Sequence, residues 1–384
     1  MLWQKCGSFS QSSFVATAFL AALTLNVNAS AQAGSDSGPL QAAATSTKFT
    51  VVRAPNVGTV TALSAIAEDD IWAVSGDDQS PALHFDGAKW NPVPLAQPSR
   101  MFGVAAVSHD DVWAVGMDPQ GLHAAIQHFD GHKWTAVPSP RFPRGEALSN
   151  VAAVSPQDIF AVGNIIINSL DESRPLIEHF DGKTWKVVPV PEIPDIPLGS
   201  LGGIAVISAS DIWAVGTQSS GDQLALALHF NGRQWKQAVL PVTPIGAAGL
   251  GSVAAVAPND VWAVGAQAAH VLIEHFDGHE WQIVDGPILT SIDSNLISLS
   301  AISATDIWAT GCSPCGDGGI RQPALIEHWN GKEWTVNPAP PTAGIGDTGI
   351  AILTFRSGDI FVGGITELPT GPGIQSFLLH GKEE

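Results

Sequence analysis

Residues 260–281 read DVWAVGAQAAHVLIEHFDGHEW, and a variant of this segment recurs seven times along the chain. Each copy opens with an Asp-Ile-Trp-Ala-Val-Gly motif and closes with a His-Phe-Asp-Gly-x-x-Trp motif. The copies follow one another at intervals of about 48 residues, a spacing that indicates one propeller blade per copy. The opening aspartates are Asp70, Asp111, Asp158, Asp211, Asp260, Asp306 and Asp359, and the histidines are His84, His128, His179, His229, His275, His328 and His380.

Each repeat divides into four short apolar runs, rich in β-branched and aromatic residues and bounded by Gly, Pro, Asp or Asn. This pattern is typical of strands joined by hairpins, and the Asp-Gly pair supplies the positive φ of a tight turn. The seventh repeat lacks its fourth run, whereas residues 49–55 match the fourth run of other repeats. We therefore expect an all-β, seven-bladed β-propeller over residues 48–384. Each blade has four antiparallel strands, and the N-terminal strand closes the last blade.

Tryptophan is concentrated at two positions of the repeat. Of the 13 tryptophans, five stand two residues after an opening aspartate and six close a repeat. A large aromatic side chain at the same two positions of every blade favours packing between blades over ligand stacking. The repeated histidines stand on seven radial blades and cannot converge on one ion, so we expect no metal site there. We expect each of them to bond to a turn aspartate or a backbone group.

The N-terminus has the pattern of a secretory signal peptide over residues 1–33. Lys5 is its only charged residue, residues 14–25 form an apolar core, and an Ala-Gln-Ala sequence at 31–33 fits a cleavage site. The apolar core is too short to span a bilayer, and no later segment has the pattern of a transmembrane helix. We expect a secreted or periplasmic protein, with a flexible lead-in over residues 34–47.

The chain is strongly acidic, with 36 Asp and Glu against 17 Lys and Arg and a formal net charge of −19. Such a surface repels phosphate backbones, so nucleic acid is excluded as a partner class. It favours solubility, and any charged partner is expected to be cationic. We expect a monomer.

Cys312 and Cys315 are the two cysteines outside the leader. In an exported protein the pair favours a disulfide that fixes one loop. A redox site would need the motif to open a helix, which the strand repeat does not provide, and zinc would need two further ligands.

The strand order places the loop after each second strand, together with the connectors between blades, on one face of the ring. The spacing from opening Asp to His varies from 14 to 22 residues, whereas the spacing from His to Trp is constant at six. Variable loops on a rigid scaffold are the usual place for a binding site. We expect a protein or glycan ligand, with bound calcium as an open alternative because the loops lean acidic. The candidate residues are Asp77, Asp78, Asp118, Asp171, Glu172, Asp222, His270, Asp317 and Glu367.

The first strands carry aliphatic, Ala and Ser residues, which offer few acids, bases or ligands near the axis. We therefore expect no catalytic residue, no cofactor and no metal site, and the sequence favours a binding module over an enzyme. The alternative is a polysaccharide hydrolase or lyase that uses carboxylates and basic groups of the connectors. The residues for it would be Arg141, Arg144, Glu146, Glu192 and Asp195.

Residues 177–185, IEHFDGKTW, resemble kelch repeats such as those of the central domain of galactose oxidase, in an exported bacterial type of propeller. They also resemble the Asp-box hairpin of sialidase-like propellers. Both resemblances imply a propeller. The chain contains no tyrosine, so it has neither the tyrosyl-radical copper site nor the tyrosine nucleophile of these families. No catalytic residue is carried over.

Overall fold

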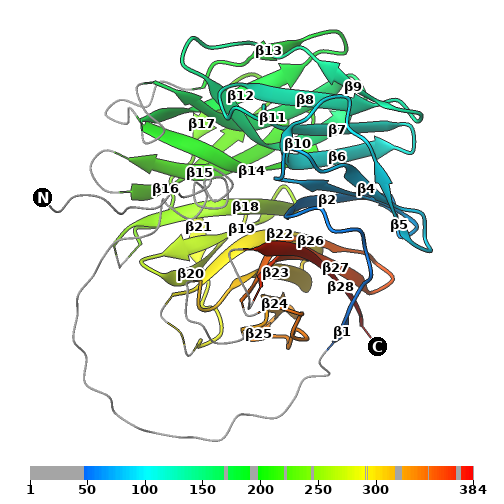
Figure 1. Cartoon of the computed structure of the whole chain (residues 1–384). Coiled ribbons are helices and arrows are strands. Elements are labelled where there is room, and N and C mark those ends of the chain that lie inside the picture. Colours follow the sequence, from blue (N-terminus) through cyan, green and yellow to red (C-terminus); the bar gives the residue numbers. More distant parts are fainter. Residues whose placement is uncertain are drawn as a thin grey trace, which may run out of the picture. The chain divides into compact units, whose positions relative to one another are not determined.

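The computed structural model describes residues 47–167, 172–190, 198–219, 223–243, 246–289, 291, 293–315, 322–344, 346–368 and 373–383. These residues all belong to one compact unit, Ser46–Glu384. They form seven four-stranded antiparallel sheets arranged as the blades of a propeller, which confirms the expected architecture (Figure 1). The described residues include no helix that could cross a membrane. The signal peptide expected at 1–33 and all but the last residue of the lead-in expected at 34–47 lie outside them.

Each of the first six blades takes four consecutive strands, and the first strand lies innermost. Blade one contains β2 (Val60–Ala67), β3 (Asp70–Ser75), β4 (Ala82–Phe85) and β5 (Trp90–Val93). Blade two contains β6 (Arg100–Ser108), β7 (Asp111–Met117), β8 (Ala124–Phe129) and β9 (Trp134–Val137), and blade three contains β10 (Glu146–Ser155), β11 (Asp158–Ile166), β12 (Ser173–Phe180) and β13 (Trp185–Val187). Blade four contains β14 (Leu198–Ser208), β15 (Asp211–Ser219), β16 (Gln223–Phe230) and β17 (Trp235–Gln237), and blade five contains β18 (Ala248–Ala257), β19 (Asp260–Gln267), β20 (His270–Phe276) and β21 (Trp281–Ile283). Blade six contains β22 (Asn295–Ser303), β23 (Asp306–Cys312), β24 (Leu325–Trp329) and β25 (Trp334–Val336).

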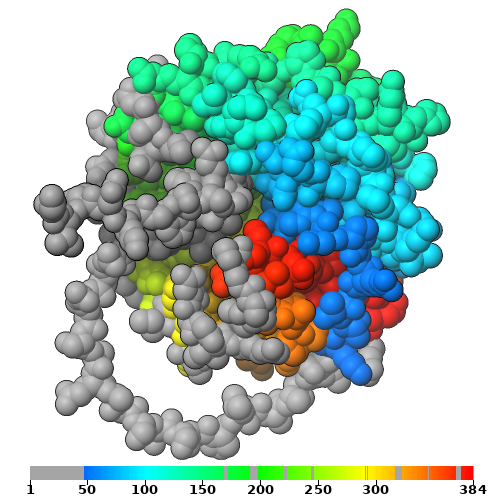
Figure 2. Space-filling model, in the orientation of Figure 1, coloured from blue at the N-terminus to red at the C-terminus, as the bar shows by residue number. Residues whose placement is uncertain are grey.

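Blade seven is assembled from both ends of the propeller. Its first three strands are β26 (Asp347–Thr354), β27 (Asp359–Glu367) and β28 (Ile374–Lys382), and its fourth is β1 (Lys48–Val51). β1 runs antiparallel to β28, with Phe49 opposite Gly381. The blue and red segments accordingly lie side by side in Figure 2. The expectation that the N-terminal strand closes the last blade is confirmed.

The innermost strands of neighbouring blades touch around the axis. The Ala106 N–H donates to Ser64 Oγ (3.0 Å), and the Ile352 N–H donates to Ser298 Oγ (3.2 Å). A Cβ added at Gly103 would lie 2.7 Å from Asn150 Cα in the next blade. The small residues of the first strands therefore allow seven backbones to converge, because a larger side chain would force them apart.

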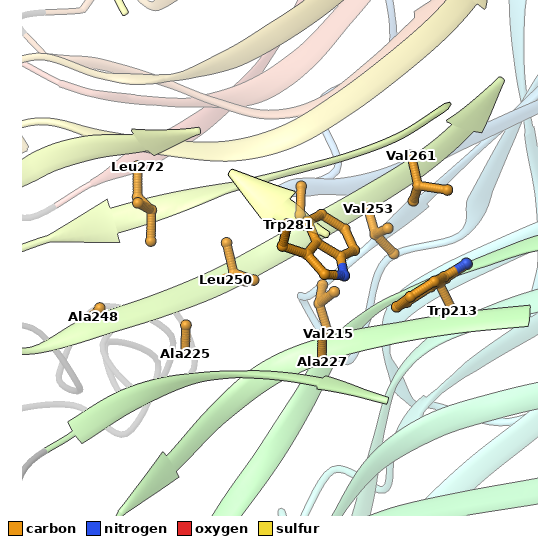
Figure 3. Packing of buried hydrophobic residues seen from close by; sticks show 11 residues of the cluster. Trp213, Val215, Ala225, Ala227, Ala248, Leu250, Val253, Val261, Leu272 and Trp281 are labelled. Atoms are coloured by element: carbon orange, nitrogen blue, oxygen red, sulfur yellow. The ribbon is translucent and has the colours of Figure 1, made fainter. Parts of the chain in front are cut away.

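An aromatic contact repeats at all seven interfaces between blades. The aromatic residue of each second strand meets, edge to face, the aromatic residue of the fourth strand in the next blade, with ring centroids 5.2 to 6.4 Å apart. Figure 3 shows one such pair, Trp213 and Trp281, among the aliphatic side chains of blades four and five. Packing between blades, as expected, is the role of these positions. The pairs are Trp72–Trp134, Trp113–Trp185, Phe160–Trp235, Trp213–Trp281, Trp262–Trp334, Trp308–Phe49 and Phe361–Trp90.

Each repeated histidine stacks on the second-strand aromatic of its own blade and bonds to the opening aspartate. The Nε2 to Oδ1 distances run from 2.7 Å at His179 to 3.0 Å at His328. The hairpin aspartate, such as Asp181, is exposed and instead accepts backbone N–H groups of its own turn. The histidines keep about a fifth to a third of their side chains exposed, so they lie at the edge of the core and not within it.

Replacing an interface aromatic with alanine should destabilise the propeller far more than replacing it with phenylalanine, the residue that blade seven has at this position. Trp281 is 5% exposed, so Trp281→Ala should lower the free energy of unfolding by about 3–5 kcal/mol, whereas Trp281→Phe should cost roughly 1–2 kcal/mol. Phe49 occupies the equivalent position of blade seven and serves as the precedent. Urea denaturation measures both changes, and equal losses would contradict the packing role.

Removing β1 should open the ring. A chain lacking residues 1–54 loses the fourth strand of blade seven and exposes the edge of β28, so it should aggregate or melt at least 10 °C lower, on the order expected when several kcal/mol are lost. A chain lacking residues 1–46 keeps β1 and is the matched control. Equal melting temperatures of the two chains by differential scanning calorimetry would show that β1 does not close the ring.

Candidate functional site

The two faces of the ring are built from different connections. We call the loops between second and third strands, together with the connectors between blades, the variable face. The opposite side, made of the turns within strand pairs one–two and three–four, is the hairpin face. On the variable face the loops are tied to the connectors by backbone bonds: Ser99 N–H to Asp78 O (3.2 Å), and Glu146 N–H to Leu122 O (3.0 Å). The loops therefore vary in length on a fixed base.

The hairpin face repeats one rigid turn. In blade three the Asp181 Oδ1 accepts the N–H groups of Lys183 (3.0 Å) and Thr184 (2.9 Å), and the Lys186 Nζ contacts the other carboxylate oxygen. Lys186 and these backbone amides hold the pKa of Asp181 well below its usual range. Asp181 is therefore ionised at neutral pH, and its role in the turn is structural.

Six of the nine candidate residues lie among the described residues, on the variable face; Asp171, Asp222 and Asp317 lie outside them. Asp118 Oδ1 accepts the Leu122 N–H (2.9 Å), and Asp77 Oδ1 accepts the Gln79 N–H (3.1 Å). These aspartates therefore hold their own loops in shape.

His270 begins β20 in blade five, and Glu367 ends β27 in blade seven. His270 is exposed and follows a two-residue turn in which Ala268 and Ala269 both have positive φ, 44° and 69°. Ala269 O accepts the Ser294 N–H (2.8 Å) of the next connector, and the Glu367 N–H donates to Gly346 O (3.1 Å). Positive φ at both central residues is the geometry of a tight hairpin. The bond to Ser294 therefore ties this two-residue loop of blade five to the next connector, and the His270 side chain is exposed.

His123 and Glu146 form a contact on the variable face that the sequence analysis missed as a pair. Glu146 is fully buried; its carboxylate accepts the Phe142 N–H (2.9 Å) and the Ala124 N–H (3.2 Å), and both oxygens lie 3.3 Å from His123 Nδ1. Glu146 is one of the connector residues named for the alternative function, a polysaccharide hydrolase or lyase. Its bonds show that it fastens the connector to the loop of blade two. The sequence offered one indication of this contact, since His123 is not one of the seven repeated histidines.

The acidic loop residues do not converge on one point in the described part of the chain. There, one group of three His, Cys, Asp or Glu side chains has donor atoms within 4.8 Å of one another: Asp306, His328 and Glu383, on the hairpin face. It extends the repeated Asp–His pair of blade six, since His328 Nε2 lies 3.0 Å from Asp306 and 3.7 Å from Glu383. The variable face therefore offers separate carboxylates spread over several blades.

Cys312 and Cys315 are joined by a disulfide with Cα atoms 4.9 Å apart. Cys312 ends β23, so the bond lies at the variable face. The Cys315 N–H donates to Asp293 O (2.8 Å), and Ser313 Oγ lies 2.8 Å from Ser294 Oγ. The disulfide and these bonds fix the start of the blade-six loop against the preceding connector.

Three third strands carry a glutamate immediately before the repeated histidine, and all three glutamates are fully buried. Burial raises the pKa of Glu178 to about 8, of Glu274 to about 7 and of Glu327 to about 8. Glu178 accepts a bond from Ser139 Oγ (3.1 Å), whereas both oxygens of Glu274 and of Glu327 have no hydrogen-bond partner among the described residues. Blade two has Gln127 at this position, which accepts the Ala96 N–H and donates to Gln97 O. At a pH below these values the buried carboxyl groups are therefore protonated and uncharged.

These glutamates should make the propeller more stable in mild acid. Because the folded-state pKa values exceed the ordinary 4.5, the folded state binds more protons, and stability falls as pH rises from about 4.5 to 8. We expect the double variant Glu274→Gln/Glu327→Gln to remove more than ~1 kcal/mol of the loss between pH 5 and pH 8. Urea unfolding at both pH values measures it. Gln127 shows that the amide is tolerated, and an unchanged slope would contradict this account.

Comparison with solved structures finds other propellers. YCF48 bound to D1 peptide is 16% identical, with a TM-score of 0.57, over 88% of this chain and 95% of that one. YCF48 from Cyanidioschyzon merolae has the same identity and TM-score, over 87% and 98%. The WD40 β-propeller domain of Doa1 is 11% identical, with a TM-score of 0.57, over 86% and 97%. Comparison with protein-family models and with curated proteins finds no match. At these identities the similarity defines the class, a seven-bladed β-propeller.

Proposed function

We propose that this protein is a binding propeller that holds a polypeptide segment on its variable face. The observation that carries the proposal is the contrast between the faces. The hairpin face repeats one turn, whereas the variable face places loops of different length on a base fixed by backbone bonds, by Glu146 and by the Cys312–Cys315 disulfide. A rigid base with loops of different length supports a binding function, and it gives no support for a catalytic one.

Charge and the structural neighbours support a polypeptide as the ligand. The net charge of −19, the exposed Glu367 and the half-buried Asp78 favour a segment rich in lysine and arginine. One neighbour of similar fold, YCF48, was solved with a peptide bound. Export from the cytoplasm, a glycan ligand and calcium are further proposals from the sequence. The kelch-like repeat type also stays a proposal, because it rests on residues 177–185, whereas the neighbours reported above are YCF48 and WD40 propellers.

Selection of peptides from a random display library on the protein gives the probe for a test. Removing two negative charges from the variable face with Asp78→Asn and Glu367→Gln should raise the Kd of a selected basic peptide at least tenfold. Stability should stay within about 0.5 kcal/mol, as for exposed sites. The matched control is Asp86→Asn with Asp130→Asn on the hairpin face. Asn231 and Asn330 stand at the same hairpin position in blades four and six, so the turn tolerates the change.

Three results would overturn the proposal. One is weakening by the control pair equal to that of the variable-face variants. Another is the absence of any selected peptide with a Kd below about 100 μM. The third is tight binding on a glycan array by a protein that selects no peptide, which would replace the polypeptide with a sugar.

A further inference from the structure

The hairpin of blade five lacks the basic residue of the other hairpins. Residues 277–281 read DGHEW, with Glu280 where blade two has Lys133 in DGHKW. The hairpins of the other complete blades carry Lys89, Lys133, Lys183, Arg233 and Lys332. The hairpin face of blade five is therefore locally more negative than its neighbours.

Blade six differs from the other blades at the adjoining position. Trp329 stands before the hairpin, where the five preceding blades have a phenylalanine. Its ring is half-buried, its Nε1–H donates to Ala304 O (3.0 Å), and its centroid lies 5.1 Å from that of Trp262 in blade five. The indole is thus held in place beside the blade-five hairpin, with part of it open to solvent.

A hollow of about 550 Å³ lies where blades five and six meet, beside Trp329. Its lining includes Asp260, Asp277 and His275 from blade five and Trp329 from blade six. The described residues that line it include no lysine or arginine. An aromatic wall beside two carboxylates is the combination that suits an organic cation.

Among the described residues, no group is hydrogen-bonded to the second oxygen of either carboxylate. Asp277 uses Oδ1 for the N–H groups of His279 (2.8 Å) and Glu280 (3.0 Å), and Asp260 uses Oδ1 for Trp262 Nε1 and His275 Nε2. The backbone amide of Glu280 lowers the pKa of Asp277, so this group is ionised at neutral pH.

Blades one and seven fill the second oxygen of the opening aspartate. His109 Nδ1 lies 2.8 Å from Asp70 Oδ2 in blade one, and Lys382 Nζ lies 2.7 Å from Asp359 Oδ2 in blade seven. In the hairpins, Asn91 Nδ2 donates to Asp86 Oδ2 (2.8 Å). The two acceptors in the hollow are therefore at positions where the chain itself supplies donors in blades one and seven.

We propose that the hollow between blades five and six binds a lysine or arginine side chain of a partner polypeptide, with the cation placed against Trp329 and neutralised by Asp260 and Asp277. This site lies on the hairpin face and does not depend on the function proposed for the variable face. A polypeptide is the occupant favoured by charge complementarity, since the chain is acidic and the described residues lining the hollow include two aspartates and no lysine or arginine.

The test compares two peptides that differ in charge alone, acetyl-Gly-Arg-Gly-amide and its citrulline counterpart. Each is titrated into the intact protein while the indole N–H resonance of Trp329 is followed by NMR. We expect the arginine peptide to bind at least tenfold more tightly than the citrulline peptide, with a Kd in the millimolar range typical of a single side chain.

Each variant borrows a residue already present in another blade, which protects the fold. Asp277→Asn follows Asn231, Trp329→Phe follows Phe276, and Glu280→Lys reproduces the hairpin of blade two. All three should weaken binding of the arginine peptide at least fivefold with an unchanged melting temperature. In the Trp329→Phe variant, the indole N–H resonance of Trp262, which also lines the hollow, is followed instead. Asp130→Asn, the same change in a hairpin that has its lysine, should leave binding unchanged.

Equal binding of arginine and citrulline peptides would overturn the proposal, as would an equal loss in Asp130→Asn and Asp277→Asn. Shifts of Trp329 caused by methyl galactoside or choline, without any caused by the arginine peptide, would assign the hollow to a sugar or a small ammonium ion. Loss of binding on the variable face would leave this result untouched.

Discussion

The edge-to-face contact between an aromatic side chain of one blade and that of the next is the interaction on which the rest of this structure depends. A single four-stranded sheet has two apolar faces and cannot bury either alone. The contact recurs at seven interfaces, including Phe361–Trp90, which joins the last blade to the first. It works only if the ring closes, and β1 supplies the strand that carries Phe49 into the final interface. Closure and packing are thus one constraint.

This constraint divides the molecule into a fixed face and a free one. The second-strand aromatic is positioned by the histidine stacked on it and by the opening aspartate, and all three lie toward the hairpin face. The turns of that face are correspondingly uniform. The loops on the other side carry none of these contacts and so vary in length, with connectors fastened by groups such as Glu146. Recognition is proposed for the loops for this reason. The hollow beside Trp329 arises where the uniform face departs from its own pattern.

The sequence predicted the repeated parts well, because seven copies reveal which positions matter. The blade count, the four strands and the pairing of residues 48–51 with the C-terminal strand all followed from the repeat. The partner of each histidine did not. The hairpin aspartate lies two residues away in sequence, whereas the opening aspartate lies 14 to 22 residues earlier, and spacing alone cannot choose between them.

The repeat pattern also failed to predict features that occur in single blades. Glu274 and Glu327 look like ordinary strand residues in the sequence, and only the structure shows that their side chains are fully buried. The His123–Glu146 contact joins two blades through a loop of individual shape. Single departures of this kind have no second copy to mark them, and their meaning appears only when neighbouring blades are brought together. The sequence does mark where to look, since Trp329 and Glu280 both break the repeat.

Amide hydrogen exchange of the second strands tests most directly whether the seven blades form one closed, cooperative ring. The account predicts that β3, β7, β11, β15, β19, β23 and β27 exchange with the same free energy of opening, equal to that of global unfolding. Because β1 and the Phe361–Trp90 contact hold blades one and seven as firmly as any others, these two should show no excess exchange. Faster exchange of β3 and β27 than of β15, by an opening free energy several kcal/mol lower, would contradict the claim.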